Sequence, residues 1–238
     1  MRSKILIIFI GLFSGCASNV LDDSFWVKSV GDRMSIIHGN DLDGTIELDE
    51  LKKLKNLYAI GPVAGLRGEV TIYDSQPSIS TVVDGSPLVT EGYVGEAIFL
   101  MYSSAPKWQA ISLENSVEGL NNIEAMVKEK AQEHGLDIDK PFPLRIEGVA
   151  EFIDYHIIFK TNNNPHNKRE HRKAKRKFSI DNQQSKIVGF WVDHNRVGKL
   201  THPGKRTHLH MLAPDNSTSG HIDAISLKKG AKLYLPKI

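Results

Sequence analysis

Alternating apolar and polar positions dominate the second half of the chain and predict β-strands. Successive side chains of a strand point to opposite faces, so this pattern is typical of strands that bury at least one face. The predicted strands cover residues 145–160, 187–193, 207–212, 221–227 and 232–235. Residues 69–74 and 78–83 alternate in the same way around Asp74-Ser75 and predict a hairpin.

Helical spacing is rarer. One apolar stripe predicts a helix near 116–134, which Gly135 would end; its members are Val117, Leu120, Ile123, Val127 and Ala131. A shorter helix is predicted over 48–57. The expected class is therefore α/β but β-rich, with two β-sheet lobes and few helices. We assign 26–140 to an N-terminal lobe that includes the helix near 116–134, and 141–238 to a C-terminal lobe.

The first residues have the pattern of an export signal. A basic start is followed by the apolar run Ile5–Phe13, which is too short to span a bilayer stably, and then by Ser14-Gly15-Cys16. This resembles the lipidation motif of bacterial lipoproteins. It predicts a signal peptide at 1–15, lipidation of Cys16 and a tether at 16–25. The protein would then be exported and anchored to a bacterial membrane, facing the periplasm or the cell surface. A plain cleaved signal and a retained N-terminal anchor are the alternatives.

Overall composition is that of an ordinary soluble domain, with 24% charged residues and a net charge of +2. Positive charge is concentrated at 166–177, where no aromatic residue is interleaved. Neither feature supports nucleic-acid binding. The segment could contact anionic lipid headgroups, although a solvated loop or hairpin tip is the favoured interpretation. A homodimer is left open.

The C-terminal histidines carry the candidate chemistry. His208 and His210 would share one face of a strand, and turn-forming residues at 213–220 would bring His221 back beside them. Three imidazoles at one point would bind a first-row metal, with zinc favoured, and would leave a position open for water or substrate. The spacing alone leaves this site and a surface histidine pair as equal alternatives. His194 and His202 lie nearby in the sequence.

Two blocks of sequence resemble the α-acetolactate decarboxylase family. The first runs from Leu57-Tyr58-Ala59-Ile60-Gly61 into Gly65-Leu66-Arg67-Gly68-Glu69. The second consists of Val188-Gly189-Phe190, Pro203-Gly204, His208-x-His210 and Gly220-His221-Ile222-Asp223. The likeness spans about residues 34–235, and its C-terminal block is the specific part.

The resemblance implies a zinc enzyme that decarboxylates a 2-hydroxy-3-keto acid, converting acetolactate to acetoin and carbon dioxide. Its substrate would be a small molecule. It also implies that His208, His210 and His221 hold Zn²⁺ on antiparallel strands of the C-terminal lobe. Glu69 would be the active-site carboxylate.

Two departures from the family pattern affect the predicted acid–base set. The family has an active-site arginine where this chain has His156, which could hold a substrate carboxylate only when protonated. Arg145, with Arg67 and Arg206 as alternatives, could replace that arginine, so Glu69, His156 and Arg145 are the predicted catalytic residues. The family also uses a glutamate from its C-terminal tail, whereas no acidic residue follows Asp223 here. The alternative function is a non-catalytic envelope lipoprotein of the same fold that binds a metal or a small anionic ligand.

Overall fold

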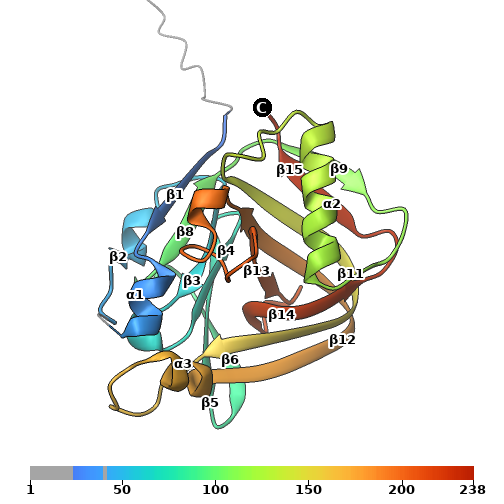
Figure 1. Cartoon of the computed structure of the whole chain (residues 1–238). Coiled ribbons are helices and arrows are strands. Elements are labelled where there is room, and N and C mark those ends of the chain that lie inside the picture. The colour runs from blue at the N-terminus through green and yellow to red at the C-terminus, as the bar shows by residue number, and fades with distance from the viewer. Residues whose placement is uncertain (1–23, 40–41) are drawn as a thin grey trace, which may run out of the picture.

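The computed structural model describes residues 24–39 and 42–238. The predicted signal peptide, Cys16 and most of the predicted tether lie outside the described residues. Two antiparallel sheets pack together, with the helices at their edges and on one outer face (Figure 1). Among the described residues, no helix is long and apolar enough to cross a bilayer.

The first sheet has six strands in the order β1-β8-β3-β4-β5-β6. Their bounds are β1 Trp26–Val30, β3 Leu57–Pro62, β4 Glu69–Tyr73, β5 Gln76–Val83, β6 Ser86–Glu91 and β8 Leu100–Ser104. The predicted hairpin forms as β4 and β5. A separate small pair joins β2 (Ile46–Glu47) to β7 (Glu96–Ala97).

The second sheet has seven strands in the order β10-β14-β13-β12-β11-β15-β9. Their bounds are β9 Trp108–Ser112, β10 Val117–Glu118, β11 Phe142–Ile158, β12 Lys175–Trp191, β13 Thr207–Leu212, β14 Ser219–Leu227 and β15 Lys232–Pro236. The long strand β11 pairs with β12 and also with β14. Strands β11, β12, β13 and β14 therefore close into a small barrel.

In the described part of the chain, three α-helices accompany the sheets: α1 Arg33–His38, α2 Leu120–Glu133 and α3 Lys168–Ala174. Each of the short helices α1 and α3 is capped by the residue before it, whose side chain accepts backbone N–H hydrogen bonds. The capping residue is Asp32 for α1 and Asn167 for α3. Single 3₁₀ turns form at Leu48–Leu51, Ala64–Leu66 and His194–Arg196.

The strand alternation divides the core into layers. Along β13, Leu209 and Met211 face the barrel interior. They belong to the same buried cluster as Ile123 and Val127 of α2, which are fully buried. The opposite face of the same strand looks toward the first sheet, where Leu212 packs in a cluster with Tyr58 and Ile60. A residue on that face of β13 is therefore enclosed between the two sheets.

Several elements differ from the sequence predictions. The helix expected over 48–57 is only a 3₁₀ turn. Helix α2 forms, but it packs on the second sheet. Strands β9 and β10 also belong to that sheet. The chain therefore passes from the first sheet to the second before residue 108, rather than at residue 140. The basic run forms α3 and the start of β12. Helix α3 lies in the connection between the paired strands β11 and β12, so the predicted hairpin tip is present but contains a helix. A capped helix and long-range pairing with β11 override the weak local signal.

Gly220 allows β14 to approach β11 closely. A Cβ atom at this position would lie 2.7 Å from the carbonyl oxygen of His156 and 2.7 Å from Cδ2 of Tyr155. The neighbouring residue His221 pairs with His156 across the same strand interface. Glycine at 220 thus sets the position of one predicted zinc ligand.

We predict that Gly220→Ala lowers the free energy of unfolding by roughly 1–3 kcal/mol, because the added methyl group forces backbone apart. Denaturant unfolding measures this, and zinc titration should show weaker binding because His221 shifts. Ala224→Ser, on the same strand at a half-buried position, is the control and should change little. An unchanged unfolding free energy for Gly220→Ala would contradict this account of the β14–β11 contact.

Candidate metal centre

Three histidine side chains converge between the sheets. His208 and His210 lie on the face of β13 that looks toward the first sheet, and His221 pairs directly with His210 across the β13–β14 hairpin. All three are buried, with at most 8% of their surface exposed. Their nitrogens lie within 4.8 Å of one another, and His208 Nε2 is 2.9 Å from His221 Nδ1. The arrangement is that of three ligands around one ion.

The outer hydrogen bonds of two rings leave their other nitrogens facing this centre. His208 Nδ1–H donates to the carbonyl oxygen of Leu200 at 3.0 Å, which leaves the Nε2 lone pair available. His210 Nδ1 contacts Thr71 Oγ1 at 3.0 Å, while His210 Nε2 is buried without a hydrogen-bond partner. An unsatisfied buried nitrogen costs about 1–3 kcal/mol. A metal ion in contact with it would remove that cost.

Burial also keeps the rings neutral. It lowers the pKa of His208 to about 4 and holds the pKa values of His210 and His221 well below their usual range. A neutral imidazole has a lone pair to give a metal, whereas an imidazolium has none. The donor set therefore fits a zinc ion.

Glu69 faces this histidine cluster from the first residue of β4. Its Oε1 accepts a hydrogen bond from the Ile158 backbone N–H at 3.2 Å, and its Oε2 lies 3.9 Å from His210 Nε2. Burial raises the pKa of Glu69 to about 8. The side chain is therefore a neutral carboxylic acid at neutral pH, and its contact with the neutral His210 ring is no ion pair.

A pocket lies beside the histidine cluster, and His156 on β11, opposite His221, lines it. Its Nδ1 is 2.9 Å from Asp223 Oδ2, and burial lowers its pKa. A neutral ring cannot supply the positive charge expected of a protonated carboxylate holder. Nitrogens of His156 and His221 also gather with Asp223 in a second possible metal-binding group, but Lys175 Nζ lies 3.8 Å from Asp223 Oδ1 and brings a cation there instead.

Arg145, the other predicted catalytic residue, is not among the residues that line this pocket. Its guanidinium group is enclosed by aromatic rings of both sheets, with ring centroids 4.4–5.6 Å from its central carbon; the rings belong to Tyr58, Tyr73, Trp108 and Tyr234. Its Nη1 also donates to the Tyr58 hydroxyl at 3.2 Å. In this structure Arg145 links the two sheets. Arg206, one of the alternatives, lies over the Trp191 ring and donates to the Val192 carbonyl.

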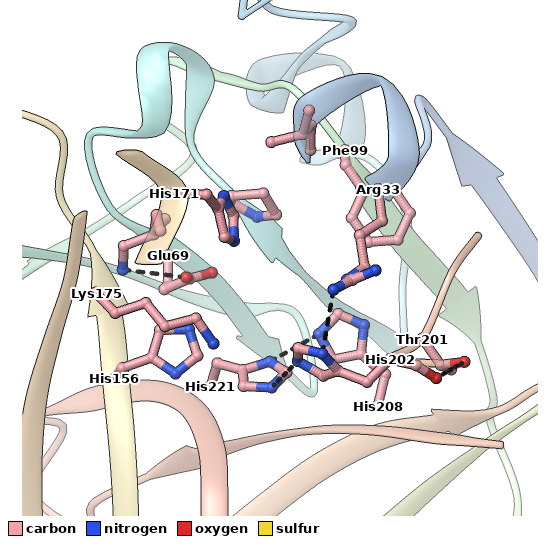
Figure 2. Close-up of a pocket in the computed structure, with 13 residues that line it drawn as sticks. Arg33, Glu69, Phe99, His156, His171, Lys175, Thr201, His202, His208 and His221 are labelled. Carbon is pink, nitrogen blue, oxygen red and sulfur yellow. Dashed lines mark hydrogen bonds between the residues drawn. The ribbon is translucent and has the colours of Figure 1, made fainter. Parts of the chain in front are cut away.

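The pocket contains residues that sequence reasoning missed. It encloses about 490 Å³ of space, part of it open to solvent. Figure 2 shows Arg33 from α1 and Lys175 from the start of β12 on different sides, with the histidines between them. His202, noted only as a nearby histidine, places its Nε2 3.2 Å from His221 Nε2. No local pattern marks Arg33 or Lys175, since only the packing of α1 and α3 brings them together.

Comparison with known proteins agrees with this architecture. The sequence profile described as Alpha-acetolactate decarboxylase matches residues 33–236. The chain belongs to the alpha-acetolactate decarboxylase family. Among curated protein sequences, no match was found.

Solved structures of the family share the fold. The chain is similar to alpha-acetolactate decarboxylase from Bacillus subtilis strain 168, with a TM-score of 0.73, 19% identity, and coverage of 89% of this chain and 86% of that one. It is also similar to a Staphylococcus aureus protein of unknown function that resembles alpha-acetolactate decarboxylase, with a TM-score of 0.69, 15% identity, and coverage of 88% and 84%. The β-rich two-sheet architecture is thus the family fold.

We predict that zinc raises the melting temperature of the purified protein and that a chelator reverses this, because a ligand bound only by the folded state stabilises it. His208→Ala should abolish both the bound zinc, measured by atomic absorption, and the zinc-dependent rise. His134→Ala, at an exposed position after α2, is the control. Stoichiometric zinc in His208→Ala would show that the ion binds elsewhere.

For Arg145, we predict a role in stability only. Arg145→Met keeps an apolar chain but loses the cation–π contacts and the bond to Tyr58, which should cost roughly 2 kcal/mol of unfolding free energy. Zinc stoichiometry should stay unchanged. Arg172→Met, an exposed arginine on α3, controls for loss of charge. Loss of zinc from a folded Arg145→Met protein would contradict the assignment.

Proposed function

We propose that the protein is a zinc-dependent decarboxylase of acetolactate-type 2-hydroxy-3-keto acids, converting acetolactate to acetoin and carbon dioxide. Membership of the alpha-acetolactate decarboxylase family supports the reaction class. The observation that carries the proposal is the buried cluster of three histidines beside a neutral carboxylic acid.

His208, His210 and His221 would hold the zinc. When bound there, zinc supplies a Lewis acid that stabilises negative charge on the substrate ketone oxygen. The side chains of the pocket exclude water and supply the proton. Burial of all three rings between the sheets excludes water from most of the site and strengthens its electrostatic interactions.

Glu69 is the proton donor in this proposal. When carbon dioxide leaves, the electron pair of the broken carbon–carbon bond remains on the former carboxyl-bearing carbon, conjugated with the ketone as an enediolate. Glu69 Oε1 accepts the Ile158 N–H, so the proton is placed on Oε2, which faces the histidines. Its transfer to that carbon completes the hydroxyketone, and the resulting carboxylate regains a proton from solvent. A raised pKa keeps the acid loaded at neutral pH.

The second candidate is a non-catalytic protein that binds a metal or a small anionic ligand in the same pocket. One observation favours it: Asp223 is engaged by His156 and Lys175, and Glu69 is the one acid that lines the pocket among the described residues. A pocket with a single carboxylic acid has fewer acid–base groups than the family pattern implies.

Location in the cell envelope is part of the proposal. It rests on the lipoprotein-like motif at Cys16, which lies outside the described residues. Mass spectrometry of the protein purified from membranes would show the lipid on Cys16, and Cys16→Ala should release the protein to the soluble fraction.

The decisive experiment measures acetoin released from acetolactate by the zinc-loaded protein. Glu69→Gln keeps the size and the Ile158 contact but removes the transferable proton. We predict that it lowers kcat by about 10²–10⁴-fold while zinc stays bound. Glu118→Gln, on β10 away from the pocket, should have full activity. Stoichiometric zinc without turnover in the wild type would reject the enzyme and favour the binding protein.

A further inference from the structure

Two cations face the candidate metal centre from separate elements. Arg33 is the first residue of α1, and Lys175 is the first residue of β12. Both line the pocket, and their charged ends point into it from different sides (Figure 2). Glu69, His208 and His221 line the same pocket. The mechanism proposed above uses neither cation.

Arg33 is half-buried among neutral groups. Its Nη2 lies 3.3 Å from His202 Nδ1, and its Nη1 donates to the Gly198 carbonyl at 3.5 Å, a long contact. Among the described residues, no carboxylate pairs with it. Burial alone lowers the pKa of Arg33, as expected for a cation that has lost water without gaining an acid. Such a group is a binding position for an anion.

Lys175 has only part of a counter-charge. Its side chain is 17% exposed, and its Nζ lies 3.8 Å from Asp223 Oδ1. The other oxygen of Asp223 accepts from His156. One carboxylate at the edge of the pocket therefore serves both neighbours.

These charges define the ligand. A zinc dication would add two further positive charges to those of Arg33 and Lys175, whereas the nearby carboxyl groups are those of Glu69 and Asp223. We infer that the pocket binds a dianion. The ligand is a 2-hydroxy acid with a second carboxylate or other anionic group, which lies toward Arg33. The substrate of this class is a 2-hydroxy-3-keto acid with the same second anionic group. This inference deepens the proposed function and rests on it for the reacting end of the substrate.

The surroundings of the pocket favour the same class of ligand. Residues 168–177 include seven basic residues and one acid, and this segment supplies His171 and Lys175 to the pocket wall. The remaining basic side chains lie on and beside α3, next to these two residues. A positive potential there would raise the local concentration of anions. Figure 1 places α3 at the opposite end of the molecule from the start of β1, so the basic segment lies far from that strand end.

A matched pair of ligands tests the inference. Lactate and malate share the 2-hydroxy acid group that can chelate zinc, and malate adds one carboxylate. Calorimetric titration of the zinc-loaded protein should show malate binding about tenfold more tightly, the worth of one charge-assisted hydrogen bond. Arg33→Gln should remove most of this preference and change lactate affinity little. Arg33→Lys retains the charge and should preserve part of the preference for malate. This variant also shows whether the fold survives a substitution at position 33. Arg169→Gln, which removes one charge from α3 outside the pocket, should preserve all of it.

Three results would overturn the dianion pocket: equal affinities in the wild type, no binding of either acid, or an undiminished preference in a folded Arg33→Gln protein. The binding measurement is independent of turnover. A protein that prefers malate through Arg33 yet releases no carbon dioxide from acetolactate would refute turnover of acetolactate and leave the dianion pocket standing. Turnover of acetolactate without any preference for malate would refute only the dianion.

Discussion

At His221, strand β14 pairs with two neighbouring strands, and the candidate site depends on that double pairing. Through β13 it sets His221 opposite His210, and through β11 it sets His221 opposite His156. The barrel closed by these pairings fixes the ligand nitrogens through backbone hydrogen bonds on both sides of β14. Such a scaffold holds a metal site more precisely than loops would, and it explains why Gly220, with no room for a side chain, stands beside His221.

Burial between the sheets then decides the chemistry of each ionisable group. The same loss of water that lowers the pKa of the three histidines raises that of Glu69. One cause thus produces both metal-binding imidazoles and a loaded carboxylic acid, because the neutral form of each is favoured. On an exposed strand face the same residues would be partly charged imidazoles and an ionised carboxylate.

The sequence was most informative where function depends on spacing within a hairpin. The strands at 207–212 and 221–227 and the convergence of their histidines follow from alternation and from the turn residues between them. Arg145 shows the limit of such reasoning. Its position in a matching segment suggested catalysis, but the rings of Tyr58 and Trp108 come from other strands and enclose it. Arg33 was missed for the converse reason, since nothing near it in the chain resembles a site, and its role depends on a helix that packs beside α3. Contacts between residues far apart in sequence decided both cases.

The candidate metal ligands and the cations of the pocket come from different parts of this fold. The three histidines belong to a closed barrel and Glu69 to β4, whereas Arg33 lies on α1 and Lys175 at the junction of α3 with β12. A substitution in α1 can change the charge of the pocket without disturbing the hydrogen bonds that hold the histidines. The barrel, by contrast, tolerates little, because His221 is tied to two strands at once. It follows that substrate preference in this architecture can change while the metal centre is retained.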